Sequence, residues 1–103
     1  MNNELKDKLD AAAFRELLSH LDARKDVQNI DLMILAGFCR NCMSKCLMAA
    51  ADEQGVAMDY DQAREQVYRM PYEQWKQNHQ TPATDAQKSA FAAMEAAKAA
   101  AKQ

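Results

Sequence analysis

The stretch that decides the fold is DLMILAGFCRNCMSKC, residues 31–46. Its apolar residues recur with helical spacing, and no proline or run of β-branched residues interrupts them. Asn29 is a suitable N-cap before this stretch, and Gly55 is a suitable helix stop after it. We therefore expect one central helix of about 25 residues, from about Ile30 to Gln54, some 37 Å long.

The composition of the whole chain supports a helical protein. Its 103 residues are 49% hydrophobic and 27% charged, with two glycines and two prolines. This scarcity of turn residues argues against a β fold, and the length fits a single domain, residues 1–103. We expect an all-α protein, an irregular bundle of four to five helices around one long central helix.

The remaining helices are predicted from apolar periodicity and capping signals. They are a first helix from about Asn3 to Asp22, a short one after Asp59 through Arg69, another after Pro71, and an Ala-rich C-terminal helix over about 84–102. In the first helix Leu5 and Leu9 lie on a different face from the later leucines. Its first turns therefore either pack on something else, such as another subunit, or fray.

The charge balance argues against a nucleic-acid partner, and the sequence lacks the apolar segments of membrane and secreted proteins. The formal net charge is −2, and no basic stripe is present, so a nucleic-acid partner is not expected. No segment approaches the ~18 apolar residues of a membrane span, and the N-terminus lacks a signal-peptide apolar region. An odd number of cysteines without such a signal predicts free thiols and a cytoplasmic location.

The three cysteines have helical spacing. Cys39, Cys42 and Cys46 stand at i, i+3 and i+7, which places their thiols on one face of a straight helix. The same face holds Leu32, Leu35, Met43 and Ala50. Free cysteine packs as a small hydrophobe, so the favoured interpretation is that these thiols belong to the core.

Two chemical alternatives remain for Cys39 and Cys42. A structural zinc site needs four ligands, and the missing donors would have to come from His20, His79 or a partner subunit. Redox activity requires a thiol at a helix N-terminus or beside a cation. A central helix running through Cys39 weakens the redox case, whereas a helix broken at Gly37 would place Cys39 in a fresh first turn and strengthen it.

The opposite face of the same predicted helix carries a polar patch. Its members are Gly37, Arg40, Asn41, Ser44 and Lys45. Glycine in a helix interior is tolerated where a backbone or ligand approaches closely. The patch could contact a protein partner, hold a small ligand or anion, or be a plain solvated surface. No catalytic motif is present, which favours a function other than catalysis.

Two blocks of sequence resemble a known bacterial family. The first comprises DVQNIDLM (26–33), LAGFCRNC (35–42) and Ser44–Lys45, and the second is AREQVYRMPYEQWK (63–76). They resemble domain of unknown function family 1244, with a similarity that extends over about residues 14–80. The resemblance implies a compact helical fold and a homodimer, and it brings no activity. Where the family typically has Trp this chain has Cys46, which implies that Cys46 is not a ligand shared by the family.

The function expected from these observations is a non-enzymatic module that self-associates or binds a protein partner. The alternative is a metal-binding or redox-active thiol protein that uses Cys39 and Cys42, with zinc as the less favoured cofactor. The first hypothesis draws on the polar patch, and the second draws on the cysteine face of the same predicted helix.

Overall fold

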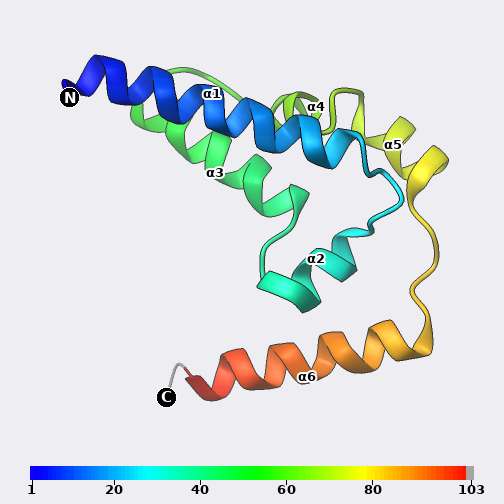
Figure 1. Ribbon diagram of the computed structural model, residues 1–103. Coiled ribbons are helices and arrows are strands. Elements are labelled where there is room, and N and C mark those ends of the chain that lie inside the picture. The colour runs from blue at the N-terminus through cyan, green and yellow to red at the C-terminus, as the bar shows by residue number, and fades with distance from the viewer. Residues whose placement is uncertain (102–103) are drawn as a thin grey trace.

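The computed structural model describes residues 1–101, and over this range it is all-α, as the composition predicts (Figure 1). Its helices are α1 (Asn3–Asp22), α2 (Asn29–Ala36), α3 (Arg40–Glu53), α4 (Tyr60–Tyr68), α5 (Tyr72–His79) and α6 (Asp85–Ala101). The first helix has the bounds expected from the sequence. The predicted C-terminal helix also forms, although the expected end at residue 102 lies outside the described residues.

The prediction of one long central helix is wrong. The chain forms α2 and α3 instead, and their axes differ in direction by 81°. Gly37 ends α2 in the left-handed conformation (φ 65°), and its N–H donates to Met33 O at 2.8 Å. Cys39 then adopts an extended conformation as the N-cap of α3. Residues with positive φ are usually glycine, which explains why the helix ends at this position.

The start of α2 also differs from the sequence prediction by one residue. Gln28, rather than Asn29, is the N-cap, and its N–H donates to the Asp31 carboxylate at 3.0 Å. Two predicted capping boxes are confirmed elsewhere. Asp59 and Gln62 bond reciprocally at the start of α4, and Thr84 and Gln87 do so before α6. Short polar signals therefore located these helix starts within one residue.

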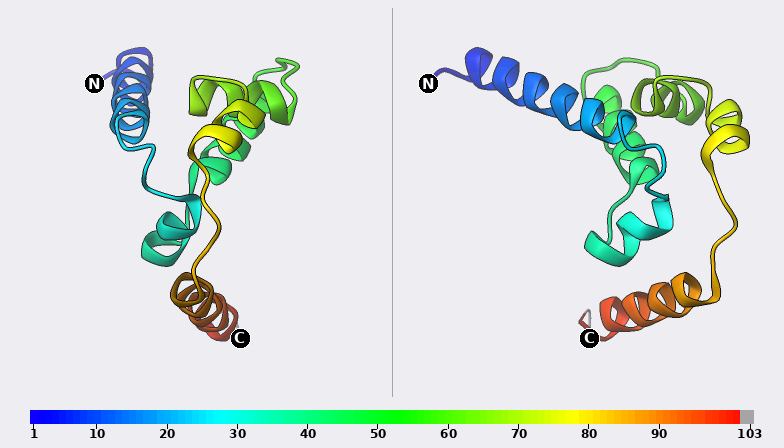
Figure 2. Two further views of the ribbon diagram at one scale, coloured as in Figure 1. Left: turned by 90° about the vertical axis from the view of Figure 1, so that its right-hand side faces the viewer. Right: turned by 45° about the vertical axis from the view of Figure 1, so that its right-hand side comes forward.

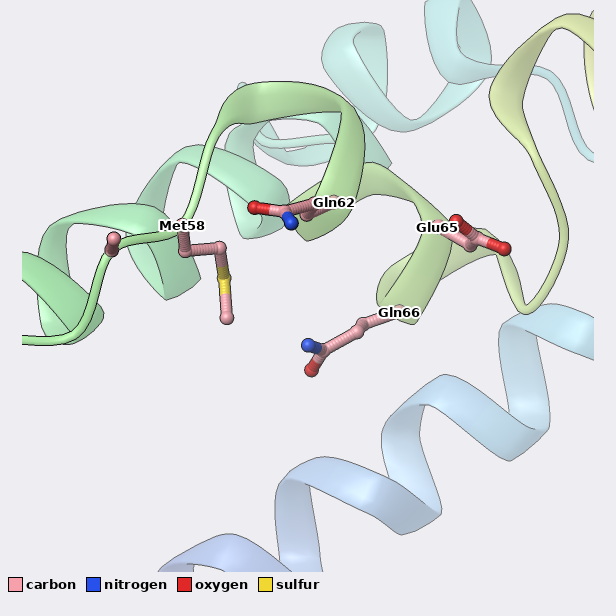
Figure 3. Close-up of a pocket in the computed structure, with 5 residues that line it drawn as sticks. Met58, Gln62, Glu65 and Gln66 are labelled. Carbon is pink, nitrogen blue, oxygen red and sulfur yellow. The ribbon is translucent and has the colours of Figure 1, made fainter.

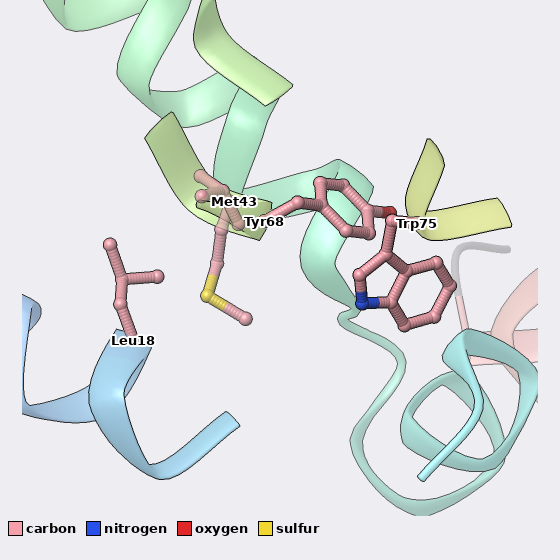
Figure 4. Close-up of a cluster of buried hydrophobic side chains, with 5 residues drawn as sticks. Leu18, Met43, Tyr68 and Trp75 are labelled. Atoms are coloured by element: carbon pink, nitrogen blue, oxygen red, sulfur yellow. The ribbon is translucent and has the colours of Figure 1, made fainter. Parts of the chain in front are cut away.

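The core lies where α1, α3, α4 and α5 meet (Figure 4). Its buried members are Leu18, Met43, Val67, Tyr68 and Trp75. The Tyr68 and Trp75 rings meet edge to face, with centroids 5.0 Å apart. Such aromatic pairs add about 0.5–1.5 kcal/mol beyond the area that they bury. The α3–α4 contact is the most extensive between any two helices of residues 1–101.

Helix α6 stands apart from this core. Figures 1 and 2 show it beyond α2, on the side away from α1 and α4, and its main packing contact is with α2. Phe91 and Met94, the large apolar residues of α6, are partly buried. The side chain of Gln87 donates to Asp31 Oδ1 at 2.9 Å and fixes the start of α6 beside α2. The α2–α6 pair is therefore a lobe attached to the body through α2.

Within residues 1–101, no single helix is long and apolar enough to cross a membrane. Helices α2 and α3 reach the required length and composition only when taken together, across their 81° bend.

Candidate functional site

The bend between α2 and α3 brings two thiols close together. Cys39 Sγ lies 3.8 Å from Cys42 Sγ, and Cys42 Sγ lies 3.9 Å from Met33 Sδ of α2. We call Met33, Cys39 and Cys42 the thiol corner. Cys39 is the N-cap of α3 and Cys42 is its third helical residue. The side chain of an N-cap faces the first turn of its helix, which explains why the two sulfur atoms approach each other.

The two thiols of the corner differ in exposure. Cys39 is 6% exposed, whereas Cys42 is only partly buried. Burial raises the pKa of Cys39, and the backbone N–H groups of Cys42 and Asn41 in the first turn oppose this effect. Although Cys39 is the N-cap, its side chain makes no capping hydrogen bond to the backbone of α3. At neutral pH Cys39 is therefore a protonated, sheltered thiol.

The expected core face of three cysteines forms only in part. Cys39 and Met43 are buried, but Cys46 is exposed and Leu35 is 82% exposed. The bend accounts for Leu35, because residues before Gly37 belong to α2 and no longer share a face with the residues of α3. The core interpretation therefore applies to Cys39 and does not extend to Cys46.

Arg40 is a buried cation at the start of α3. Its guanidinium, 2% exposed as a residue, donates to Val27 O at 2.7 Å, to Asn29 Oδ1 at 3.1 Å and to Arg24 O at 3.0 Å. It also stacks over the Trp75 ring, 5.0 Å from the centroid. Within residues 1–101 it forms no ion pair with a carboxylate, and burial lowers its pKa. Arg40 thus fastens the loop between α1 and α2 to the core.

A chain of hydrogen bonds continues from Arg40 to α4. Asn29, which accepts from Arg40, donates through Nδ2 to Tyr68 Oη at 2.9 Å. Tyr68 in turn donates to Asn41 Oδ1 at 2.6 Å. Burial raises the pKa of Tyr68 far above its usual value, so its hydroxyl keeps the proton that it donates. This polar network joins α2, α3 and α4 inside the domain.

The predicted polar patch does not form one exposed surface. Arg40 and Ser44 are buried, and Ser44 Oγ donates to Arg40 O at 2.9 Å. Asn41 is partly buried in the network, Lys45 is exposed beside the Tyr60 ring, and Gly37 lies at the bend. Arg40, Asn41 and Ser44 hold the domain together from within, which leaves Lys45 as the exposed charged member.

The histidines named as possible zinc donors do not join the thiols. His79 lies against Trp75, with ring centroids 5.8 Å apart, and His20 is exposed beside Glu16. Over residues 1–101 no group of three or more His, Cys, Asp or Glu side chains could hold a metal ion. A metal held by Cys39 and Cys42 would therefore need further ligands from another molecule.

Gln28 is a structural residue that the sequence analysis missed. Its amide donates to His79 O at 2.9 Å, and its carbonyl accepts from Thr81 N at 3.0 Å. These bonds tie the start of α2 to the end of α5 and the segment that follows. The spacing of Gln28 to Asp31 signals a helix start, but no local pattern points to partners more than fifty residues away.

The hollow beside α4 offers little to a small ligand. This hollow, of about 300 Å³, is lined by Met58, Gln62, Glu65 and Gln66 with Ala57 (Figure 3). Four of these five residues are exposed, and no charged or polar group is buried within it. Ligand sites usually enclose most of their ligand and direct a few fixed polar groups at it. The thiol corner is therefore the part of the structure whose side chains are best suited to a chemical reaction.

A known protein family matches a large part of the chain. A protein-family model described as Protein of unknown function (DUF1244) matches residues 27–93. The chain belongs to this family. The match confirms the resemblance seen in the sequence, and it runs from the end of the α1–α2 loop into the first half of α6. It therefore contains the thiol corner, the polar network and the α2–α6 contact. No curated protein matches the chain.

Proposed function

We propose that this member of the DUF1244 family is a non-enzymatic module that forms a homodimer through the outer surface of α2. The observation that carries the proposal is the exposure of α2. Six of its eight residues are apolar, yet none of the eight is buried. A helix that is apolar around most of its circumference is normally enclosed on all sides. Helix α6 covers only part of α2, which leaves apolar surface for a second copy.

Exposed apolar residues lie at the end of α2 and in the bend that follows it. They are Leu35, Ala36 and Phe38, which we call the corner patch. Leu35 is 82% exposed and Phe38 is 43% exposed. In a twofold dimer the same patch on each copy would face its counterpart or a neighbouring apolar surface. Burying a fully exposed leucine or phenylalanine contributes about 1.5–3 kcal/mol.

The start of α1 is a second unsupported apolar surface. Residues 1–10 are all exposed, and Leu5 and Leu9 are each 48% exposed. An isolated helix shorter than about 12–15 residues is marginal in water, so these turns gain from a neighbouring surface. This is the displaced stripe that the sequence analysis associated with either a subunit contact or fraying.

The single chain has a larger accessible surface and a larger radius of gyration than a compact monomer of the same size. Its accessible area is 7241 Å² for a mass of 11.6 kDa, whereas a compact monomer of this mass exposes about 5,800 Å². Its radius of gyration is 15.7 Å, compared with about 13 Å for a compact chain of this length. The excess area is larger than the ~800 Å² that each partner buries in a stable interface.

Size-exclusion chromatography with light scattering tests the proposal over a range of micromolar concentrations. The wild-type chain should have twice the mass of one chain. Leu35→Glu should shift the equilibrium to the 11.6 kDa monomer, because a charge in an apolar interface is costly to desolvate. Gln77→Glu adds the same charge at an exposed position of α5 and should leave the dimer intact.

Two results would overturn the proposal. The first is a wild-type monomer at every concentration. The second is a Leu35→Glu variant that dimerises as well as Gln77→Glu. Because Leu35 is 82% exposed in the single chain, loss of the dimer in Leu35→Glu with an unchanged helical circular dichroism spectrum separates interface damage from unfolding.

A further inference from the structure

We propose that Cys39 and Cys42 form a reversible intramolecular disulfide by exchange with low-molecular-weight disulfides. The two sulfur atoms already lie 3.8 Å apart, and a disulfide bond is about 2.05 Å long. Closing the gap requires less than ~2 Å of sulfur movement. This inference is independent of the proposed dimer, because both thiols belong to the same chain.

The bend at Gly37 makes this closure possible. In the interior of a helix, two side chains three residues apart are fixed on the helix surface. Here Cys39 is the N-cap and has extended backbone angles (φ −130°, ψ −174°) outside the helix. The Cys39 carbonyl still accepts the first helical hydrogen bond, from Met43 N at 3.1 Å. Small rotations at Cys39 can therefore bring the sulfur atoms together while the hydrogen bonds of α3 remain in place.

The difference in exposure assigns a role to each thiol. Cys42 is partly exposed, so an external disulfide reaches its sulfur first, whereas Cys39 is 6% exposed and its sulfur lies 3.8 Å from that of Cys42. Cys42 is therefore the entry nucleophile and Cys39 the resolving thiol. The thiolate is the attacking species, so the thiol that solvent and small disulfides reach reacts first.

The exchange has two balanced steps. The Cys42 thiolate attacks one sulfur of a small disulfide, RSSR, and forms a mixed disulfide while the other RS⁻ leaves and takes up a proton. Cys39 then gives its proton to solvent, and its sulfur attacks Cys42 Sγ and displaces the second RS⁻. The two protein thiols lose two electrons in total, and RSSR is reduced to two RSH.

The test uses the full chain with Cys46→Ser, so that the exposed third thiol does not react. The reduced protein is equilibrated with reduced and oxidised glutathione in graded ratios, quenched with acid, alkylated and weighed by intact mass spectrometry. Oxidising ratios should give a species two hydrogens lighter than the dithiol, with no alkylated cysteine. Peptide mapping should join Cys39 to Cys42, and reducing ratios should restore the dithiol.

Single-cysteine variants in the same background test the assigned roles. Cys39→Ser keeps a residue preferred at N-caps and should accumulate a glutathione adduct on Cys42. Cys42→Ser should react at least tenfold more slowly, because its remaining thiol is buried. Equal rates of adduct formation in the two variants would overturn the roles.

The result for the Cys46→Ser chain decides the inference even if one of the single-cysteine variants fails to fold. The inference is overturned if the folded Cys46→Ser chain keeps both thiols or carries only glutathione adducts at oxidising ratios. It is also overturned if the Cys39–Cys42 bond forms only after denaturation. Non-reducing electrophoresis supplies an independent readout, because the proposed bond leaves each chain at its own mass whereas a bond between copies doubles it.

Discussion

The hydroxyl of Tyr68 donates a hydrogen bond of 2.6 Å to Asn41 Oδ1, and this bond connects α4 to the first turn of α3. The same hydroxyl accepts a hydrogen bond from Asn29 at the start of α2. Three helices thus meet at one buried oxygen atom. The two hydrogen bonds at this oxygen hold the start of α2 and the start of α3 to α4, and so help to fix the bend between α2 and α3.

Tyr68→Phe should lower the free energy of unfolding by about 1–3 kcal/mol, because two amide groups lose their partner in a buried site. Urea denaturation measures the loss. Tyr60→Phe is the matched control: the Tyr60 ring contacts Arg64, and within residues 1–101 its hydroxyl makes no such bond. Equal losses in the two variants would contradict the importance of the Tyr68 hydroxyl.

Arg40→Lys should destabilise the domain by about 2–3 kcal/mol, although the charge is kept. An ammonium group cannot reproduce the planar fork that donates to Val27, Asn29 and Arg24. Arg24→Lys is the matched control, because the Arg24 side chain makes an exposed ion pair with Asp26, while its carbonyl, which accepts from Arg40, is unchanged by the substitution. That variant should change stability by less than about 1 kcal/mol. Thermal unfolding of both proteins compares the two losses.

Gly37→Ala should destabilise the domain by about 1–2 kcal/mol through backbone strain alone. A Cβ atom at this position would meet nothing within 4 Å, so the cost comes from the positive φ rather than from a clash. Gly37→Asn should cost less, because asparagine tolerates this conformation better. Chemical denaturation of the three proteins tests the expected order of stability, in which the wild type is highest, Gly37→Asn is next and Gly37→Ala is lowest. A Gly37→Ala variant as stable as the wild type would contradict this order.

The stability of the fold should fall in alkaline solution. Burial raises the pKa of Cys39 and of Tyr68, so the folded chain holds both protons to higher pH than the unfolded chain. Their contribution is fully present below the ordinary pKa values and is lost as pH rises toward the raised ones. Unfolding free energies should decline from about pH 9 upward, by at most ~1.4 kcal/mol per pH unit for each group.

Urea denaturation between pH 7 and alkaline values measures this slope. Tyr68→Phe, which has one fewer titrating group, should show a shallower decline above about pH 10. The opposite outcome, a stability that rises with pH over this range, would mean that the two buried groups do not dominate the linkage.

The sequence predicted the helices better than the way in which they join. Local signals sufficed for α1 and for the capping boxes at Asp59 and Thr84, because a cap involves residues only three positions apart. The break at Gly37 was missed because helical periodicity continues across it. A single glycine costs a helix only about 1 kcal/mol, so packing decides whether the helix continues.

The candidate site could be predicted only in outline. The pairing of Cys39 with Cys42 follows from their spacing once the helix is broken between Gly37 and Cys39. The burial of Arg40 could not be predicted, because its acceptors lie 11 to 16 residues earlier, in the loop after α1 and at the first residue of α2. A helical projection assumes one straight axis, and the 81° bend invalidates it for any pair of residues on opposite sides of Gly37.

The neutral partners of Arg40 give the domain a distinctive response to ionic strength. Its charge is satisfied by carbonyl and amide oxygens and by the Trp75 ring, away from solvent. Ions in solution screen exposed pairs such as Lys6–Asp10, but they act weakly on buried contacts. Added salt should therefore loosen the periphery of the molecule while the attachment of the α1–α2 loop stays unchanged.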